Sequence, residues 1–293
     1  MKYTFEYNSA AELKRNVEKS KLSLVEFICA REQEFFDFSE TQVYERLSRY
    51  LATMRKSIEY GLKKKEKLIC LDNEALKLFN AKIIIAGELE LEIMYSALAV
   101  AEYNCSMGKI IACPTAGACG IVPGVLIPVS KKYNFSDEKI IDALIVSGEI
   151  GRIVANRTTI SGAAGGCMVE CGVAAAMAAA AVVRLFNGVI DEIFQAAALA
   201  LKNNLGLTCD PVGGLVEAPC AKRNSFKALD ALTAAQMALA GIKSVIPLDE
   251  VIDTVVETAQ ALPQKFKETS EGGLASTSTG IRYKKILASK KKR

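Results

Sequence analysis

Residues 39–62, SETQVYERLSRYLATMRKSIEYGL, indicate the fold class most directly. The apolar residues of this stretch recur three or four positions apart and form one stripe along a helix: Val43, Leu47, Leu51, Met54, Ile58 and Leu62. Ser39 and Gln42 have the spacing of a capping box, in which each side chain satisfies a backbone N–H group at the start of a helix. The stretch therefore predicts a long amphipathic helix that begins just after Ser39.

Helical signals of the same kind recur along the chain. Ser9 and Glu12 again have capping-box spacing, and apolar residues keep helical spacing over about 76–107, after Ser136, and between Pro247 and Pro263. Strand-type alternation is never sustained, and the run 83–85 (Ile-Ile-Ile) is too short to decide. The sequence predicts a mostly α fold whose functional site is built from Gly- and Pro-rich loops between helices.

The polarity of the chain changes near residue 70. The residues before this point are more polar, which predicts an N-terminal helical segment, 1–70, packed on a main domain, 71–293. The two parts could equally form one continuous domain. A length of 293 residues, with 51% hydrophobic and 24% charged residues, is ordinary for a globular protein with a sizeable core.

Charge and hydropathy argue against nucleic-acid and membrane partners. The net charge is only +4, and the basic runs 63–65 and 290–293 are short and have no aromatic residues among them. No apolar signal core follows Met1, and the longest apolar run, 172–183, stops at Arg184, short of the ~20 residues that a membrane-spanning helix needs. We therefore expect a cytoplasmic protein that binds neither nucleic acid nor membrane.

The nine cysteines are the most informative residue type, because in a reducing compartment they are free thiols or metal ligands. Cys29, Cys70 and Cys105 belong to helical apolar patterns and are predicted to be small core residues. The other six lie in or beside irregular stretches rich in glycine and proline: Cys113, Cys119, Cys167, Cys171, Cys209 and Cys220. Such neighbours can hold a thiolate on a turn that faces a metal.

Cysteine spacing alone leaves three interpretations open, because no pair has the short C-x-x-C spacing of ferredoxins and zinc ribbons. The first is a catalytic metal centre, and the second is a structural four-cysteine zinc site. In the third, the glycine-rich turn 161–166 binds the phosphate of pyridoxal phosphate, with Lys222 as the only lysine near a candidate loop. Histidine, the commonest general base, is absent from the sequence.

Four segments resemble the iron–sulfur-dependent L-serine dehydratases, in particular their α subunit or the corresponding half of the single-chain forms. They are 113–126 (CPTAGACGIVPGVL), 161–172 (SGAAGGCMVECG), 203–224 (NNLGLTCDPVGGLVEAPCAKRN) and 272–280 (GGLASTSTG). The chain departs from the family pattern at Met168 and Val169, where the family usually has Gln-Ala, and at Cys113, where it usually has Ala-Pro-Thr or Thr-Pro-Thr.

The resemblance implies a lyase subunit that converts L-serine into pyruvate and ammonia by means of a [4Fe–4S] cluster, without pyridoxal phosphate. The ligands that it implies are Cys167, Cys209 and Cys220, with one iron left open as a Lewis acid for the β-hydroxyl of the substrate. The remaining cysteines, Cys171 included, have no ligand role by this resemblance. It also implies a separate β subunit with a Ser- and His-rich loop, and hence an α/β hetero-oligomer.

Residues beside the implied ligands supply the other candidates. We expect Thr115, Gly117, Gly165 and Gly166 to hold the substrate carboxylate through hydroxyl and backbone N–H groups, and Arg223 to pair with it. Glu170, Asp210 and Glu217 flank the cysteines and could tune the cluster or accept a proton, although imidazole from the β subunit is expected to be the main base.

Overall fold

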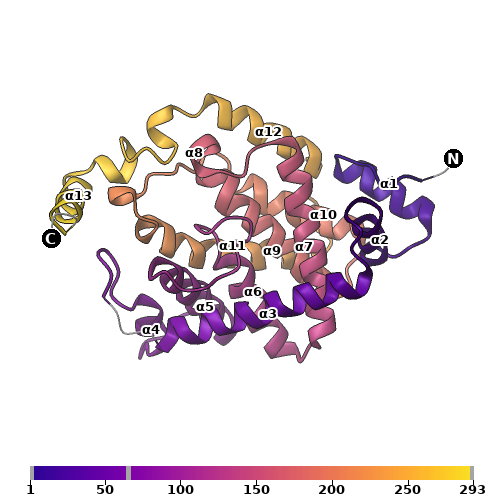
Figure 1. Cartoon of the computed structure of the whole chain (residues 1–293), viewed down its shortest axis with the longest axis horizontal. Coiled ribbons are helices and arrows are strands. Elements are labelled where there is room, and N and C mark those ends of the chain that lie inside the picture. The colour runs from indigo at the N-terminus through magenta and orange to yellow at the C-terminus, as the bar shows by residue number, and fades with distance from the viewer. Residues whose placement is uncertain (1–2, 64–66, 291–293) are drawn as a thin grey trace.

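The chain forms helices joined by turns and by several longer irregular segments (Figure 1). The computed structural model describes residues 3–63 and 67–290, so residues 1 and 2 and most of the two basic runs lie outside the described residues. Within these residues there is no strand, only an isolated parallel bridge between Cys209 and Lys267. The α-helices are α1 Ala10–Ser20, α2 Leu24–Phe36, α3 Glu40–Lys63, α4 Glu74–Phe79, α5 Glu88–Cys105, α6 Ile121–Tyr133, α7 Asp137–Arg157, α8 Gly162–Gly165, α9 Val173–Leu185, α10 Ile190–Lys202, α11 Lys222–Leu239, α12 Leu248–Ala261 and α13 Ser278–Lys290.

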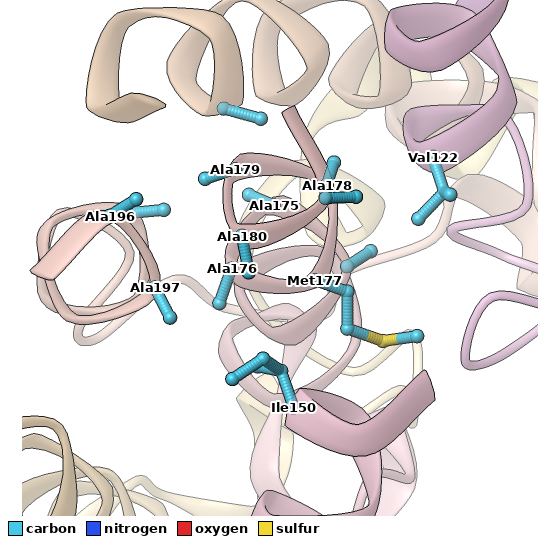
Figure 2. Close-up of a cluster of buried hydrophobic side chains, with 14 of the residues drawn as sticks. Val122, Ile150, Ala175, Ala176, Met177, Ala178, Ala179, Ala180, Ala196 and Ala197 are labelled. Atoms are coloured by element: carbon cyan, nitrogen blue, oxygen red, sulfur yellow. The ribbon is translucent and has the colours of Figure 1, made fainter. Parts of the chain in front are cut away.

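Helix α9 is the centre of the molecule (Figure 1). Every residue of this helix except Arg184 is buried, and helices α6, α7, α10 and α11 pack around it. Figure 2 shows how its small side chains let the neighbours approach, and labels Ala175, Ala176, Ala178, Ala179 and Ala180 of α9 beside Val122, Ile150, Ala196 and Ala197. A helix that is apolar on all sides is a core helix when protein surrounds it.

The same helix explains the only window of the described residues that is long and apolar enough to cross a membrane. This window, Met168–Leu185, is 89% buried inside the protein. Burial of that extent is typical of the core helix of a folded domain rather than of a membrane span.

Glycines allow close contact between helices α3, α5 and α6. A Cβ atom on Gly124 of α6 would lie 2.6 Å from the Cβ of Ala97 on α5, and one on Gly61 of α3 would lie 2.1 Å from the carbonyl oxygen of Ala99. Distances this short exclude any side chain at either position. The layer formed by these helices therefore depends on backbone-to-backbone contact.

Most helices predicted from local pattern are confirmed. Helix α3 begins at Glu40, and Ser39 and Gln42 form the expected cap, with the Gln42 N–H donating to Ser39 Oγ (3.3 Å) and the Ser39 N–H to Gln42 Oε1 (2.8 Å). Helix α7 follows Ser136, whose hydroxyl accepts from the Lys139 N–H, and α12 follows Pro247. The mostly α fold class is confirmed.

The single helical block expected over about 76–107 is wrong. The chain forms α4, which ends at Phe79, and then α5, which begins after Gly87. Three consecutive β-branched residues between them, 83–85, favour extended backbone, and they are exposed. At the other end α5 stops at Cys105, and Met107 has the left-handed φ of 63°.

The polar N-terminal helices share a core with the rest of the chain. Leu13 of α1, Phe27 of α2 and Leu51 of α3 belong to the same buried cluster as the residues of α9. Helix α3 packs on α5 and α7, and α1 contacts α12. The apolar core is therefore continuous across residue 70, where the sequence suggested a boundary.

The tight surroundings of α9 predict a strong response to a larger side chain. Replacing the fully buried Ala176 with leucine should lower stability by about 1–3 kcal/mol, because the neighbouring helices must move to accept the added atoms. Ala52→Leu on the exposed face of α3 is the control and should change stability by no more than about 0.5 kcal/mol. Thermal unfolding midpoints measure both, and equal midpoints for the two variants would contradict the central role of α9.

Candidate metal centre

Two of the three cysteines expected as ligands lie in irregular turns that lead into long helices. Cys167 immediately precedes the π-helical turn Met168–Gly172, which continues into α9, and Cys220 lies within the π-helical turn Glu217–Ala221, which continues into α11. Turns of this type are rare and are frequent at functional sites, because the wider turn re-aims side chains. Both thiols are therefore carried just before long helices, of which α9 is almost fully buried.

Backbone hydrogen bonds bring Cys209 to the first of these turns. The Met168 N–H donates to the Leu207 carbonyl (3.0 Å), which holds the segment before Cys209 against the start of α9. On its other side Cys209 donates its N–H to the Phe266 carbonyl (2.8 Å) and accepts from the Glu268 N–H (2.8 Å). Three segments that are distant in sequence thus meet around one residue.

The three cysteines line one cavity of about 190 Å³. The Sγ atoms of Cys167 and Cys209 and a carboxylate oxygen of Glu170 all lie within 4.8 Å of one another. All three cysteines are buried. The lining residues are Thr115, Ala116, Gly117, Cys167, Glu170, Cys171, Cys209, Pro211, Val216, Cys220 and Glu268.

The sulfur of Cys167 is held as a thiolate. Hydrogen bonds from the thiols of Cys171 and Cys209, followed by the charge of Arg223, hold the pKa of Cys167 well below its ordinary value. One guanidinium nitrogen of Arg223, Nη1, lies 3.3 Å from the Cys167 sulfur. The pKa of Cys209 is raised by its hydrogen bond to Cys167 and by burial, and burial raises the pKa of Cys220. Among these three cysteines, Cys167 is therefore the one that carries the negative charge.

Glu170 brings a carboxyl group into the cavity beside the sulfurs of Cys167 and Cys209. Burial and then the nearby Cys167 thiolate raise the pKa of Glu170 to about 7. The Thr115 hydroxyl lines the same cavity and lowers the pKa of Glu170 to a smaller extent. Its Oγ1 is buried and has no hydrogen-bond partner at normal geometry. Gly117 faces the same carboxylate, since a Cβ there would lie 3.7 Å from Glu170 Oε1. The structure therefore brings Glu170, Thr115 and Gly117 together.

Gly165 and Gly166 do not offer free N–H groups to a substrate, contrary to expectation. Gly165 donates to the Ser161 carbonyl (3.0 Å) and Gly166 to the Gly162 carbonyl (2.8 Å), so both donors close the short helix α8. Neither glycine lines the cavity. Gly166 has a positive φ of 76°, and a Cβ there would lie 2.9 Å from the Leu207 carbonyl oxygen, so the position requires glycine.

The Arg223 side chain is already bound to the protein and does not line the cavity. Its Nη1 donates to the Thr208 carbonyl (2.8 Å) and its Nη2 to Asp210 Oδ1 (2.8 Å). The other oxygen of Asp210 accepts the Leu274 N–H (2.8 Å). This pair of a buried aspartate and a largely buried arginine thus links the segment of Cys209 to α11 and to the turn Gly273–Ser276.

Glu217 also points away from the cavity, toward the N–H group of Cys70, which donates to its Oε2 at 2.6 Å. Asp210 and Glu217 therefore flank the ligand cysteines in sequence without facing the space that the thiols enclose. Cys70 and Cys105 are only half-buried, whereas Cys29 is buried in the core as predicted.

Sequence reasoning missed Asn224 and Glu268. The fully buried Asn224 accepts the Gly120 N–H (2.8 Å) and donates to the carbonyls of Gly117 (2.8 Å) and Cys220 (3.0 Å), so it ties two walls of the cavity together. Glu268 lines the mouth of the cavity. No local pattern marked either one, because both reach the site through contacts with residues far away in sequence.

The set of donor atoms fits a soft metal centre. Thiolates select iron–sulfur clusters, zinc and copper(I) over hard cations.

A phosphate fits the site less well than a metal does. Gly162, in the glycine turn 161–166, faces a carboxylate and a sulfur: a Cβ on it would lie 2.4 Å from Glu170 Oε2 and 3.2 Å from Cys209 Sγ. Lys222, the expected Schiff-base lysine of that interpretation, is exposed and lies 3.9 Å from Glu74.

An all-helical domain with several thiols around one small cavity has the features of a cysteine-ligated metalloprotein. Comparison with known proteins makes the assignment more specific. Residues 19–275 match the family model described as "Serine dehydratase alpha chain". The chain therefore belongs to the serine dehydratase alpha chain family.

Relatives with high identity carry corresponding names. A probable L-serine dehydratase alpha chain of Bacillus subtilis is 40% identical over 285 residues, which cover 96% of this chain and 95% of the relative. Another from Latilactobacillus sakei is 46% identical over 67% of this chain and 94% of its own length. An L-serine dehydratase of Helicobacter pylori (strain J99) is 35% identical over 93% of this chain, but only 62% of that longer protein is matched.

The contacts of Asp210 predict that removing its carboxylate lowers the stability of the protein. Asp210→Ala leaves the mostly buried Arg223 without its counter-ion and should cost about 3–5 kcal/mol. The control is Asp253→Ala, because Asp253 is largely exposed where it pairs with Arg157, and surface pairs contribute about 0–1 kcal/mol. Chemical denaturation of both variants measures the difference, and an Asp210→Ala protein as stable as the control would contradict this role.

Proposed function

We propose that this chain is the iron–sulfur subunit of an L-serine dehydratase, which converts L-serine into pyruvate and ammonia. The observation that supports it most strongly is the meeting of Cys167, Cys209 and Cys220 at one small cavity, in a chain of the serine dehydratase alpha chain family. In the proposal these three thiolates hold a [4Fe–4S] cluster. When bound, the cluster would supply an open iron site that acts as a Lewis acid on the β-hydroxyl group.

In this proposal Glu170 is the acid–base group that this chain contributes. It is the carboxyl group that lies within 4.8 Å of two of the proposed ligand sulfurs. From this place its carboxylate oxygens could exchange a proton with a small substrate in the cavity. Thr115 could donate its unpartnered hydroxyl to the substrate, and Gly117 leaves room for it.

Asp210 and Glu217 take different roles in the proposal from Glu170. Asp210 orients Arg223, whose guanidinium stabilises the Cys167 thiolate, and Glu217 fixes the turn that carries Cys220 against Cys70. These carboxylates would act through the residues that they bind. Arg223 likewise supports a ligand sulfur rather than the substrate carboxylate.

The enzyme is proposed to need a second chain. The relatives from Bacillus subtilis and Latilactobacillus sakei are named alpha chains, and the Helicobacter pylori protein extends well beyond the matched part. This chain has no histidine, the usual base near neutral pH. A β subunit with a Ser- and His-rich loop would supply that base and complete an α/β hetero-oligomer, which we place in the reducing cytoplasm.

Ligand identity is tested by single Cys→Ser changes at Cys167, Cys209 and Cys220. Each change removes one soft thiolate, so the iron content after anaerobic reconstitution should fall from about four per chain to a small fraction of that, and serine turnover should be lost. Iron and acid-labile sulfide analysis measures the first effect independently of activity.

Cys171→Ser is the matched control for these variants. Cys171 lines the same cavity and is buried, yet it is not a proposed ligand, so this variant should keep its iron. Full iron in any of the three ligand variants, or loss of iron from Cys171→Ser alone, would show that the ligand set has been chosen wrongly.

The need for a partner is tested by anaerobic assays of the reconstituted chain alone and with the β subunit. The chain alone should hold iron and sulfide but dehydrate L-serine at least about 100-fold more slowly, the usual contribution of a general base. Full activity without the partner would place the base within this sequence, and Glu170→Gln would then be the decisive variant.

A further inference from the structure

Glu268 is a carboxylate at the mouth of the cavity that nothing in the proposed chemistry uses. It is exposed, and it lines the same space as Cys167, Cys209 and Glu170. Its place is set by the backbone, because the Glu268 N–H donates to the Cys209 carbonyl (2.8 Å). The Glu268 carboxylate therefore lies where the cavity meets the solvent-exposed surface.

The turn that carries Glu268 is fastened on both sides. Before it, the Cys209 N–H donates to the Phe266 carbonyl (2.8 Å), and after it, Ser270 Oγ donates to the Pro211 carbonyl (2.7 Å). Between these ties Glu268 has a left-handed φ of 62°, which non-glycine residues adopt uncommonly and keep when surrounding contacts impose it. The carboxylate is thus presented by a rigid turn.

Among the residues that the structure describes, those lining the cavity include two carboxyl groups and no basic side chain. The two carboxyl groups are those of Glu170 and Glu268. Arg223 lies behind one wall of the cavity, where it is bound to Cys167, Thr208 and Asp210. Within residues 3–63 and 67–290, no ion pair joins Glu268 to a basic side chain. A small ligand with a positive group would supply the missing charge.

We propose that Glu268 binds the α-ammonium group of the amino-acid substrate. This inference rests on the proposed function, because L-serine carries that ammonium next to the carbon atoms that react. A charged hydrogen bond at the mouth would orient the substrate with its hydroxyl toward the thiol-lined interior, where Thr115 and Glu170 lie. It would also select amino acids over hydroxy acids of the same shape, which cannot pair with a carboxylate in this way.

The test compares Glu268→Gln with the wild type in the complete enzyme, reconstituted anaerobically and assembled with its β subunit. The variant keeps the shape of the side chain and removes its charge. KM for L-serine should rise about 10- to 100-fold, the usual worth of a charge-assisted hydrogen bond, with a much smaller change in kcat. Iron, sulfide and the visible spectrum should not change, because Glu268 is not a proposed ligand.

A second measurement separates recognition of the ammonium from a general disturbance of the site. 3-Hydroxypropionate has the carboxylate and hydroxyl of serine but no ammonium group, and its inhibition constant should be about the same in wild type and Glu268→Gln. Glu271→Gln changes a neighbouring exposed carboxylate that does not line the cavity, and it should leave KM unchanged.

The outcomes distinguish the two proposals. An unchanged KM in Glu268→Gln, or an equal loss of affinity for L-serine and 3-hydroxypropionate, would overturn the ammonium assignment alone. A wild-type complex that holds no iron or does not dehydrate L-serine would overturn the proposed function and the assignment together.

Discussion

The burial of α9 on every side is the constraint on which the rest of the structure depends. A helix surrounded by four others cannot shift without disturbing all of them, because protein interiors are close-packed. The π-helical turn Met168–Gly172 is continuous with this helix, so Cys167 and Glu170 take their positions from the core of the protein. A site built in this way is organised before any ligand arrives, which is what a functional centre needs.

The other two proposed ligands are brought to this fixed point by hydrogen bonds between distant segments. Cys209 follows the contact between Leu207 and Met168, and Cys220 is held by Asn224, which also binds Gly117. Polar groups buried this deeply must be paired, so the ties that position the thiols also satisfy the backbone of the irregular turns.

The sequence predicted the parts of the structure that local pattern controls. Helices α3 and α7 followed from apolar spacing and capping residues, whereas the break between α4 and α5 was missed because short apolar runs fit either helix or strand. The three proposed ligands came from a family resemblance, since their spacing alone left zinc and pyridoxal phosphate open. Asp210 and Glu217 lie close to ligand cysteines in sequence, but their carboxylates accept hydrogen bonds outside the cavity, from the N–H groups of Leu274 and Cys70. Side chains that are close in sequence can point in different directions. Asn224 and Glu268 depend on contacts across the fold, and no local signal could have identified them.

Whether the thiol-lined cavity holds an iron–sulfur cluster is measured most directly by the visible spectrum of the anaerobically purified chain, together with iron and sulfide analysis. We expect a brown protein with about four irons and four sulfides per chain, whose colour bleaches in air because the proposed open iron site is reachable by oxygen. A colourless protein that contains one zinc ion and no sulfide would contradict this expectation, and would make the cysteines a structural zinc site.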